Sequence, residues 1–337
     1  MDKTEMRLDP LTEAWTIFSE ARAARPAFGS VLREAMESPV PNPFLAGLER
    51  FAPHTLHETP GPLGWQVRVV PNRAPVLRVE GDPTRHGDGF YDRMDGVGAH
   101  EVIIEDPGHR ALEALSLTEV GQVINAWKVR MLDLMRDPRM RSFSILKNVG
   151  QAAGGYLHHS VSQLVAMAVI FPLLKRKLET ARAFYELKKR SIFEDILSEE
   201  VRTGTRLIYE NNGFAVFCPY AARTPFEIAI YPKRQCPDFH GLSDQEEAQL
   251  ADALRTALSK LSKALNHPPY NLMLFTAPTR TTRRDHWTSI ERDFRWHMEI
   301  VPRLDHLGGL ELGTGCWVNS VWPEVAADYL RGIAVNE

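Results

Sequence analysis

Two stretches of this chain share one pattern of hydrophobic and polar positions, and each predicts a long amphipathic helix. Each begins with a serine followed three residues later by a glutamate, Ser116 with Glu119 and Ser243 with Glu246. In this arrangement, a capping box, the two residues satisfy free backbone N–H groups at the start of a helix. Apolar residues then recur every three or four positions, the spacing of one helical face. These apolar positions are Val120, Val123, Ile124, Trp127, Met131 and Leu134 in the first stretch and Leu250, Leu254, Leu258, Leu261 and Leu265 in the second.

Segments of strand-like composition flank both predicted helices. Residues 100–105 and 143–147 lie before and after the first helix, and residues 226–232 and 270–276 lie before and after the second. The same order recurs after roughly 127 residues, the separation of the two capping serines, which indicates an internal duplication. We therefore predict an α+β fold of two halves packed as a pair, each an antiparallel sheet covered by helices.

A charged segment of helical composition separates the two repeats. It covers residues 173–200 and contains several runs of Lys, Arg and Glu. Such charge runs more often form a solvated connecting helix than a binding surface. The predicted organisation is a first half over residues 1–172, a connecting helical segment over 173–200 and a second half over 201–337.

Composition narrows the class of protein only slightly. The 337 residues are 44% hydrophobic and 25% charged, which is enough for a substantial core. The net charge of -3 lacks the strongly basic character of nucleic-acid-binding proteins, so we expect no nucleic-acid partner. No apolar run approaches the roughly 20 residues that cross a bilayer, and the polar N-terminus does not resemble a secretory signal. The three cysteines form no C-x-x-C pair, which favours reduced thiols and a cytoplasmic location.

The glycine-rich segment over residues 147–163 is the strongest candidate for chemistry. Its glycines at positions 150, 154 and 155 let backbone N–H groups approach a ligand closely. From these residues alone, two interpretations stay open: a phosphate-handling loop, or a tight turn next to a structural histidine. Alternation along a following strand would place His159, Val161 and Gln163 on one face and His158, Ser160 and Ser162 on the other.

This segment resembles the corresponding segment of the galactose-1-phosphate uridylyltransferase family, part of the histidine-triad superfamily. The family pattern reads roughly Asn-x-Gly-x-x-Ala-Gly-x-Ser-Leu-x-His-x-His-x-Gln. The family's second histidine, which takes the nucleotidyl group covalently, falls on Val161, and its serine falls on Tyr156. The positions that match are Asn148, Gly150, Ala153, Gly154, Leu157, His159 and Gln163.

Further segments carry the same resemblance along nearly the whole chain. Arg22 and Arg25 fall in the family's basic nucleotide-contacting turn, and Asn72 and Arg73 fall in the stretch that contacts nucleobase and ribose. Residues 311–315 are closer to the nucleoside-diphosphate-sugar phosphorylase branch. The resemblance implies two tandem histidine-triad-like halves, each a half-barrel sheet, and a homodimer with composite sites. The other matching segments are residues 8–12, 100–105 with His109, 218–227 and 296–304.

The resemblance also implies a structural zinc site in the first half. In the family it consists of a Cys-x-x-Cys pair and two histidines. Here the cysteine positions fall on Asn42 and Leu45, while the histidines are retained as His109 and His159. Two imidazoles without thiolates rarely form a closed four-coordinate zinc site. We therefore predict that this zinc site is lost and that no cofactor is certain.

In the second half the family places a metal or structural site on residues that match His297 and Glu299, with a glutamate near Glu179. The further histidine of that site falls on Phe275. A second interpretation remains open, in which His297 is a core histidine satisfied by a hydrogen bond with Glu299.

The Val161 position decides what chemistry the resemblance can imply. Valine has no lone pair, so the covalent nucleotidyl-histidine route is predicted to be absent. Asn148, Gly154 and Gln163 remain as phosphate-positioning groups. Tyr156 occupies space beside the phosphates or stacks on a ligand. His159 and His158 are candidates for proton transfer.

We expect a protein that binds a nucleoside diphosphate sugar or a related phosphate ester. Direct in-line transfer, phosphorolysis or a new reaction is compatible with the remaining groups. Two alternatives remain: a catalytically inactive nucleotide-binding sensor or partner subunit, and a structural dimer without a small ligand. Trp317 stands where hexose-transferring members have an acidic sugar contact, so galactose 1-phosphate is not assumed as substrate.

Overall fold

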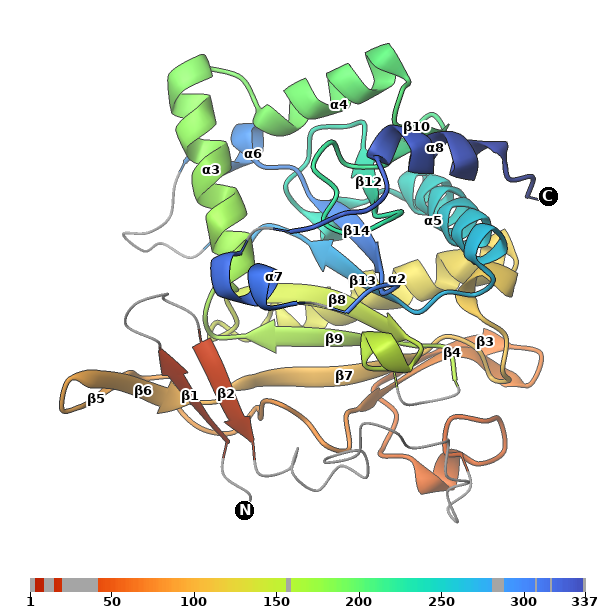
Figure 1. Cartoon of the computed structure of the whole chain (residues 1–337). Helices are drawn as coiled ribbons and strands as arrows, with labels where there is room; N and C mark the ends of the chain where they lie inside the picture. Colours follow the sequence, from red (N-terminus) through yellow and green to blue (C-terminus); the bar gives the residue numbers. More distant parts are fainter. Residues whose placement is uncertain are drawn as a thin grey trace.

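The computed structural model of the chain describes residues 4–8, 15–19, 42–155, 159–280, 288–306, 308–315 and 317–335. At its centre lies a ten-stranded antiparallel sheet, ordered β10-β11-β12-β14-β13-β8-β9-β7-β4-β3 (Figure 1). Its strands are β3 (His57–Gly61), β4 (Gly64–Pro71), β7 (Gly98–Ile104), β8 (Ser142–Val149), β9 (Val161–Met167), β10 (Leu207–Glu210), β11 (Phe214–Phe217), β12 (Ile228–Pro232), β13 (Tyr270–Phe275) and β14 (His297–Pro302).

The strand order is the same when it is followed from either edge of this sheet to its centre. One half contributes β3-β4-β7-β9-β8, the other contributes β10-β11-β12-β14-β13, and β8 pairs with β13 at the junction. Leu146 pairs with Met273 across the junction and with Gln163 on its other side. Met273 pairs with Glu299 in the same way, so Gln163 and Glu299 hold equivalent positions. The predicted α+β duplication is confirmed, with one difference: the half-sheets join edge to edge into one continuous sheet.

Helices α2 (Leu117–Leu134) and α5 (Asp244–Leu265) pack side by side on one face of the sheet (Figure 1). Both predicted capping boxes are formed. Glu119 N donates to Ser116 Oγ over 3.3 Å, and Ser243 N donates to Glu246 Oε2 over 2.9 Å. The apolar faces of both helices are buried in one core with the inner face of the sheet, which accounts for their hydrophobic spacing.

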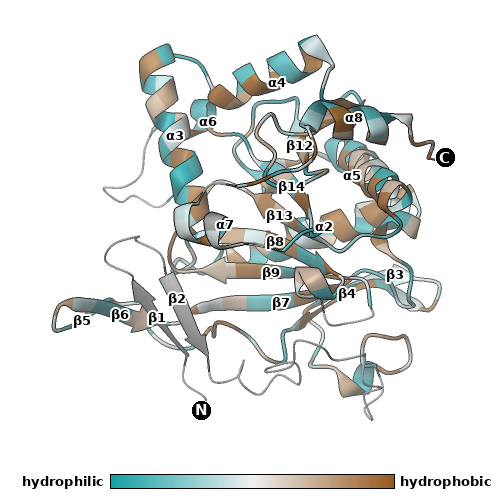
Figure 2. Ribbon diagram, in the orientation of Figure 1, coloured by the Kyte–Doolittle hydropathy of each residue, from teal (hydrophilic) through white to brown (hydrophobic). Residues whose placement is uncertain are grey.

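The charged connecting segment forms two helices, α3 (Pro172–Lys188) and α4 (Ile192–Thr203). The break between them comes at Lys189, whose φ of 58° ends α3 in the left-handed conformation typical of helix termini. Figure 2 shows α3 with long hydrophilic stretches, yet Leu174, Leu178 and Ala181 are buried in a second core cluster. The segment is therefore packed along one face as well as solvated along the other.

The remaining elements lie around this frame. A four-stranded sheet has the order β2-β1-β6-β5. Within the described residues, no helix combines the length and apolar character that a membrane-spanning helix needs. The bounds are β1 (Thr4–Leu8), β2 (Trp15–Ser19), β5 (His86–Asp88), β6 (Tyr91–Asp95), α6 (Ile290–Asp293), α7 (Gly309–Thr314) and α8 (Pro323–Gly332), with short 3-10 turns at Glu49–Phe51, Leu112–Ala114, Gln151–Ala153 and Phe239–Gly241.

Candidate functional site

A small pocket opens where β8 ends and β9 begins. Ser162 Oγ accepts a hydrogen bond of 2.7 Å from Trp127 in α2, so its neighbours Val161 and Gln163 point to the opposite face of the sheet. No lining residue in the described part of the chain carries a charge. The pocket brings together three of the predicted phosphate-binding residues, Asn148, Gly154 and Gln163, with Asn72. Its lining residues are Asn72, Val102, Asn148, Gly154, Gly155, Val161 and Gln163.

The glycine-rich loop packs tightly on the strand that precedes it. Gly154 has φ 78°, a left-handed conformation that glycine adopts without steric cost. A Cβ at Gly155 would lie 2.6 Å from the backbone oxygen of Asn148. The loop can therefore approach Asn148 this closely only because Gly155 has no side chain.

The amide of Asn148 is oriented by the second half of the chain. Asn271 in β13 donates from Nδ2 to Asn148 Oδ1 over 2.7 Å and to the Ala153 carbonyl oxygen over 2.8 Å. Because the oxygen of the Asn148 amide is already engaged, its NH₂ group is the part that remains for a ligand.

The other two amides in the pocket also have their oxygens engaged. Ala74 N donates to Asn72 Oδ1 over 3.0 Å. Gln163 Oε1 lies 2.7 Å from Nε2 of His100, a buried residue of β7. The pocket therefore holds three carboxamides whose oxygens bind groups of the protein. The NH₂ groups of Asn148 and Gln163 are left as donors, whereas Asn72 Nδ2 lies 3.0 Å from His100 Nε2.

Val161 gives this donor-rich pocket an apolar wall. Its side chain is 9% exposed and belongs to a small hydrophobic cluster with Trp65, Val70, Val102 and Ile104. The valine side chain offers neither a lone pair nor an acidic proton, so it cannot act as a nucleophile, an acid or a base.

A buried ion pair fixes the start of β9 on the face of the sheet opposite the pocket. Lys147 Nζ lies 2.6 Å from Glu105 Oε2, and it also donates to Ser160 Oγ over 3.0 Å and to the Val161 carbonyl oxygen over 3.3 Å. Lys147 and Asn148 are consecutive residues of a strand, so they point to opposite faces. The ion pair therefore fixes the backbone of the pocket without entering it.

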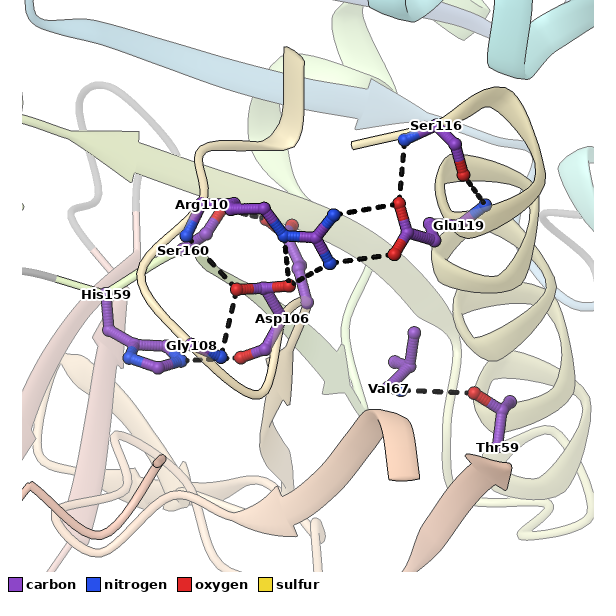
Figure 3. Close-up of polar contacts among 10 residues, drawn as sticks. Thr59, Val67, Asp106, Gly108, Arg110, Ser116, Glu119, His159 and Ser160 are labelled. Atoms are coloured by element: carbon purple, nitrogen blue, oxygen red, sulfur yellow. Dashed lines mark hydrogen bonds and ion pairs between the residues drawn. The ribbon is translucent and has the colours of Figure 1, made fainter. Parts of the chain in front are cut away.

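His159 is not among the described residues that line the pocket. It lies two residues before Val161, where β9 begins, and its ring packs against Phe44 with 5.7 Å between the centroids. Its Nε2 lies 2.8 Å from the Asp106 carbonyl oxygen, and Asn42 Nδ2 lies 3.3 Å from its Nδ1 (Figure 3 shows the first contact). A carbonyl can only accept, so Nε2 carries the proton and Nδ1 accepts.

The surroundings of His159 favour a structural role. Burial lowers the pKa of its imidazole, although the hydrogen bond to the Asp106 backbone opposes this effect. The Asp106 carboxylate in turn binds Arg110, and Arg110 also binds Glu119 of the first capping box (Figure 3). His159 thus anchors the loop before α2, and its two nitrogens are not available for proton transfer in the pocket.

Of the other three positions implied for zinc, two lie next to His159, namely His109 and Asn42. The His109 ring centroid lies 5.7 Å from that of His159, and Asn42 supplies a hydrogen-bond donor where a thiolate would be needed. Across the described ranges, no group of three or more His, Cys, Asp or Glu side chains could hold a metal ion. With an amide and a leucine at the two thiolate positions, Asn42 and Leu45, these residues do not fit a closed zinc site.

The second half contains a buried charge cluster at the equivalent place. Val161 and His297 each lie two residues before the equivalent pair Gln163 and Glu299, so His297 is the counterpart of Val161. Lys177 of α3 fills this site: its Nζ lies 2.8 Å from His297 Nε2, binds Glu299 and sits 3.8 Å from the Phe275 ring centroid.

Arg223 completes the cluster from the other side. Its Nη2 lies 2.5 Å from Glu299 Oε2 and 2.5 Å from Glu227 Oε1, and its guanidinium carbon lies 6.0 Å from the Trp317 ring centroid. Two cations and two carboxylates are therefore paired inside the protein, which satisfies the charges without a metal ion.

These contacts explain the titration behaviour of the cluster. Burial, together with the nearby Lys177 ammonium, lowers the pKa of His297 to about 3. Burial would raise the pKa of Glu299, but Lys177 and Arg223 hold it at about 2. His297 is therefore neutral and Glu299 ionised at neutral pH. The hydrogen bond from Lys177 to Nε2 and the contact of Nδ1 with the Arg295 carbonyl oxygen at 2.9 Å fit this neutral form.

Glu179 does not belong to this cluster, which corrects the prediction that grouped it with His297 and Glu299. Its side chain is 57% exposed and lies 3.8 Å from Lys175. Residues two apart on a helix point in nearly opposite directions, so the face that carries Lys177 inward turns Glu179 to solvent. The charge run of α3 gave no sign of which lysine would be buried.

Other predicted site residues are placed as follows. Arg73 is exposed and does not line the pocket. Arg22, Arg25, Tyr156 and His158 lie outside the described residues.

His100, Asn271 and Lys177 are the residues whose importance sequence reasoning missed. The first two carry a weak signal, because each is a polar residue inside a largely apolar strand.

Comparison with known protein families identifies the first half. Residues 76–170 match the family described as galactose-1-phosphate uridyl transferase, N-terminal domain. An ADP-glucose phosphorylase of Arabidopsis thaliana is 32% identical over 338 residues, covering 98% of this chain and 93% of that protein. A galactose-1-phosphate uridylyltransferase of Thermotoga maritima is 28% identical, covering 98% of this chain and 99% of that protein.

Solved structures agree with these relatives. The crystal structure of an Arabidopsis thaliana ADP-glucose phosphorylase with bound ADP-glucose has a TM-score of 0.77 at 31% identity, covering 98% of this chain and all (100%) of that one. A uridylyltransferase mutant has a TM-score of 0.79 at 25% identity, covering 97% of both chains. With its duplicated sheet, its glycine-rich pocket and a full-length relative above 30% identity, the chain belongs to the galactose-1-phosphate uridylyltransferase family.

Proposed function

We propose that this protein binds a nucleoside diphosphate sugar with its phosphates in the pocket between β8 and β9. The observation that carries the proposal is the group of carboxamides in this pocket, whose oxygens bind groups of the protein. Asn148 and Gln163 keep their NH₂ groups as donors there. Phosphate oxygens are acceptors only, so donors held in fixed positions beside a glycine loop match their chemistry. Arg22 and Arg25 are proposed as further nucleotide contacts.

We further propose that transfer proceeds in a single in-line step. An acceptor oxygen attacks the α-phosphorus of the nucleotide, and the bond from that phosphorus to the bridging oxygen of the sugar phosphate breaks. With inorganic phosphate as acceptor, ADP-glucose would yield ADP and glucose 1-phosphate. Val161 excludes a covalent step at its own position, and fixed donors can stabilise the charge of such a transition state without one.

ADP-glucose and phosphate are the first substrates to test, because a full-length relative at 32% identity is named an ADP-glucose phosphorylase. Phosphorus NMR would follow the reaction, with UDP-glucose and GDP-sugars in parallel and with galactose 1-phosphate as an alternative acceptor. Appearance of a sugar 1-phosphate together with a nucleotide product supports transfer. Spectra unchanged over hours, for every pair, refute it.

The number of displacements can be read from stereochemistry. With an ADP-glucose analogue that carries sulfur in one configuration at the α-phosphorus, one displacement inverts that configuration and two displacements retain it. Intact mass spectrometry adds a second measure: wild type should form no nucleotidyl adduct. Val161→His, which restores the family's nucleophile, is the matched comparison. An adduct on a wild-type histidine would disprove the single-step route.

A second candidate function is supported by the same pocket. Its described lining contains no nucleophile and no titratable side chain, as expected for a nucleotide-binding sensor or partner subunit without activity. Thermal stabilisation distinguishes the two candidates when it is measured with turnover. A ligand at 100 times its Kd adds about 2.7 kcal/mol to the free energy of unfolding. Stabilisation by nucleotide sugar without any product favours the sensor.

The cellular setting follows from the same proposal. Cys218 and Cys236 are free and buried, which suits a reducing compartment, and we propose the cytoplasm. A homodimer is proposed on the basis of family membership, and the molar mass in solution tests it.

A further inference from the structure

One buried histidine lies directly behind the pocket and has no assigned role. His100 is 6% exposed and comes from β7, next to the strand that carries Gln163. It is not among the residues that line the pocket. Both of its ring nitrogens make contacts: Nδ1 with Val76, and Nε2 with Gln163 and Asn72.

These contacts determine which nitrogen of His100 carries the proton. Val76 N lies 3.2 Å from His100 Nδ1, and a backbone N–H can only donate, so Nδ1 must be the acceptor. In the neutral imidazole the proton is then on Nε2.

The proton on His100 Nε2 in turn determines the orientation of the Gln163 amide. Nε2 can donate only to an acceptor, and Gln163 Oε1 lies 2.7 Å away. Asn72 Nδ2 lies 3.0 Å from the same nitrogen, but an amide nitrogen only donates, so with Nε2 protonated this is a contact between two donors. Of the two amides, only Gln163 can therefore accept the Nε2 proton.

The orientation matters because a carboxamide has two opposite ends. With Oε1 held by His100, Gln163 keeps its NH₂ group for the pocket. With the amide reversed, Oε1 would face the phosphate oxygens and repel them. The hydrogen bond from Val76 N thus sets the tautomer of His100. That tautomer in turn sets which end of the Gln163 amide faces a ligand.

We infer that His100 is a positioning residue for phosphate recognition: it holds the Gln163 amide with its donor end toward the pocket. This inference rests on the proposed function, because it assigns the role of His100 in the same site. It predicts that the effects of His100 and Gln163 on ligand affinity are coupled.

A double-mutant cycle measures this coupling. Kd for ADP-glucose would be determined by calorimetry without phosphate for wild type, His100→Phe, Gln163→Ala and the double variant. Each single change should weaken binding about tenfold, the loss expected when a donor to phosphate is misplaced or removed. The double variant should bind within about twofold of the weaker single variant, because His100 acts only through Gln163.

Losses that multiply in the double variant would overturn the inference, since they would mean that His100 supports the fold independently of Gln163. Should His100→Phe fail to fold, the tautomer itself is measurable in the unaltered protein. The ¹⁵N shifts of His100 should show a proton on Nε2 and none on Nδ1, and the reverse pattern refutes the mechanism.

Failure of the inference and failure of the proposed function are distinguishable in these experiments. If wild type binds none of ADP-glucose, UDP-glucose and GDP-sugars, the proposed function fails. If wild type binds and the cycle is additive, only the role of His100 fails.

Discussion

Replacing Lys177 by methionine tests the second-half charge cluster directly. The Lys177 side chain is 22% exposed and its ammonium lies between His297 and the Glu299 carboxylate, above the Phe275 ring. Methionine preserves much of the length and apolar character of the side chain but removes the charge. Arg223 would then face two carboxylates, Glu227 and Glu299, in a buried site with a net charge of about -1.

The expected loss can be judged from the burial of both partners. Glu299 is 12% exposed, and removal of one member of a buried ion pair costs about 3–5 kcal/mol because the remaining charge is left uncompensated. Lys175 offers a matched control two residues away on the same helix. Its side chain is 48% exposed and 3.8 Å from the exposed Glu179, so Lys175→Met should cost less than about 1 kcal/mol.

Urea unfolding at pH 7 would measure both variants against wild type. A further variant with Lys177→Met and Glu299→Gln removes one charge of each sign and should be more stable than Lys177→Met alone. The reasoning is refuted if Lys177→Met and Lys175→Met lie within about 0.5 kcal/mol of each other. Metal analysis of the Lys177→Met protein adds a separate readout: it shows whether a metal ion binds at His297 and Glu299 once the Lys177 ammonium is gone.

Three further predictions concern pH, the loop and the amide. Burial depresses the pKa of His297 from 6.5 to about 3 in the folded protein, so its contribution to stability is complete above pH 6.5 and falls by about 1.4 kcal/mol per pH unit below it. Urea unfolding at pH 7 and pH 5 should give a smaller difference for His297→Phe than for wild type, and equal differences contradict the assignment. Gly155→Ala places a Cβ 2.6 Å from the Asn148 oxygen and should weaken ADP-glucose binding at least tenfold, whereas Gly154→Ala, with open space around it, should cost about 1 kcal/mol of stability and less affinity. Gln163→Glu preserves the bond from His100 but replaces NH₂ by a charged oxygen, so it should weaken binding more than Gln163→Ala; affinity equal to wild type would show that this end of the amide does not meet the phosphates.

The elements of this fold were largely predictable because their signals are local. A capping box needs only two residues three positions apart, and both predicted boxes are formed, at Ser116 and Ser243. The repeated order of strand and helix likewise indicated the duplication. Local patterns do not say how the halves meet, because pairing of Leu146 with Met273 depends on edges far apart in the chain.

The candidate site was predictable only in part. Asn148, Gly154 and Gln163 lie on one glycine-rich segment and do meet in the pocket. The contacts of His159 with Asn42 and the Asp106 carbonyl oxygen were not predictable, because both partners lie more than 50 positions away. Asn271 was missed because its partner Asn148 lies 123 positions away, and no spacing rule connects the two.

The sequence by itself determined the capped helices, the duplicated order and the absence of a nucleophile at Val161, because each depends on side-chain type or short-range spacing. Only the tertiary structure decided which side chains carry their charge or amide inward. Lys175, Lys177 and Glu179 all belong to one charged run in α3. Of these three, Lys177 is the one that contacts the buried residues His297 and Glu299. The physical reason is that burial and hydrogen-bond partners come from segments distant in the chain, and they alone set the charge, tautomer and orientation of each group.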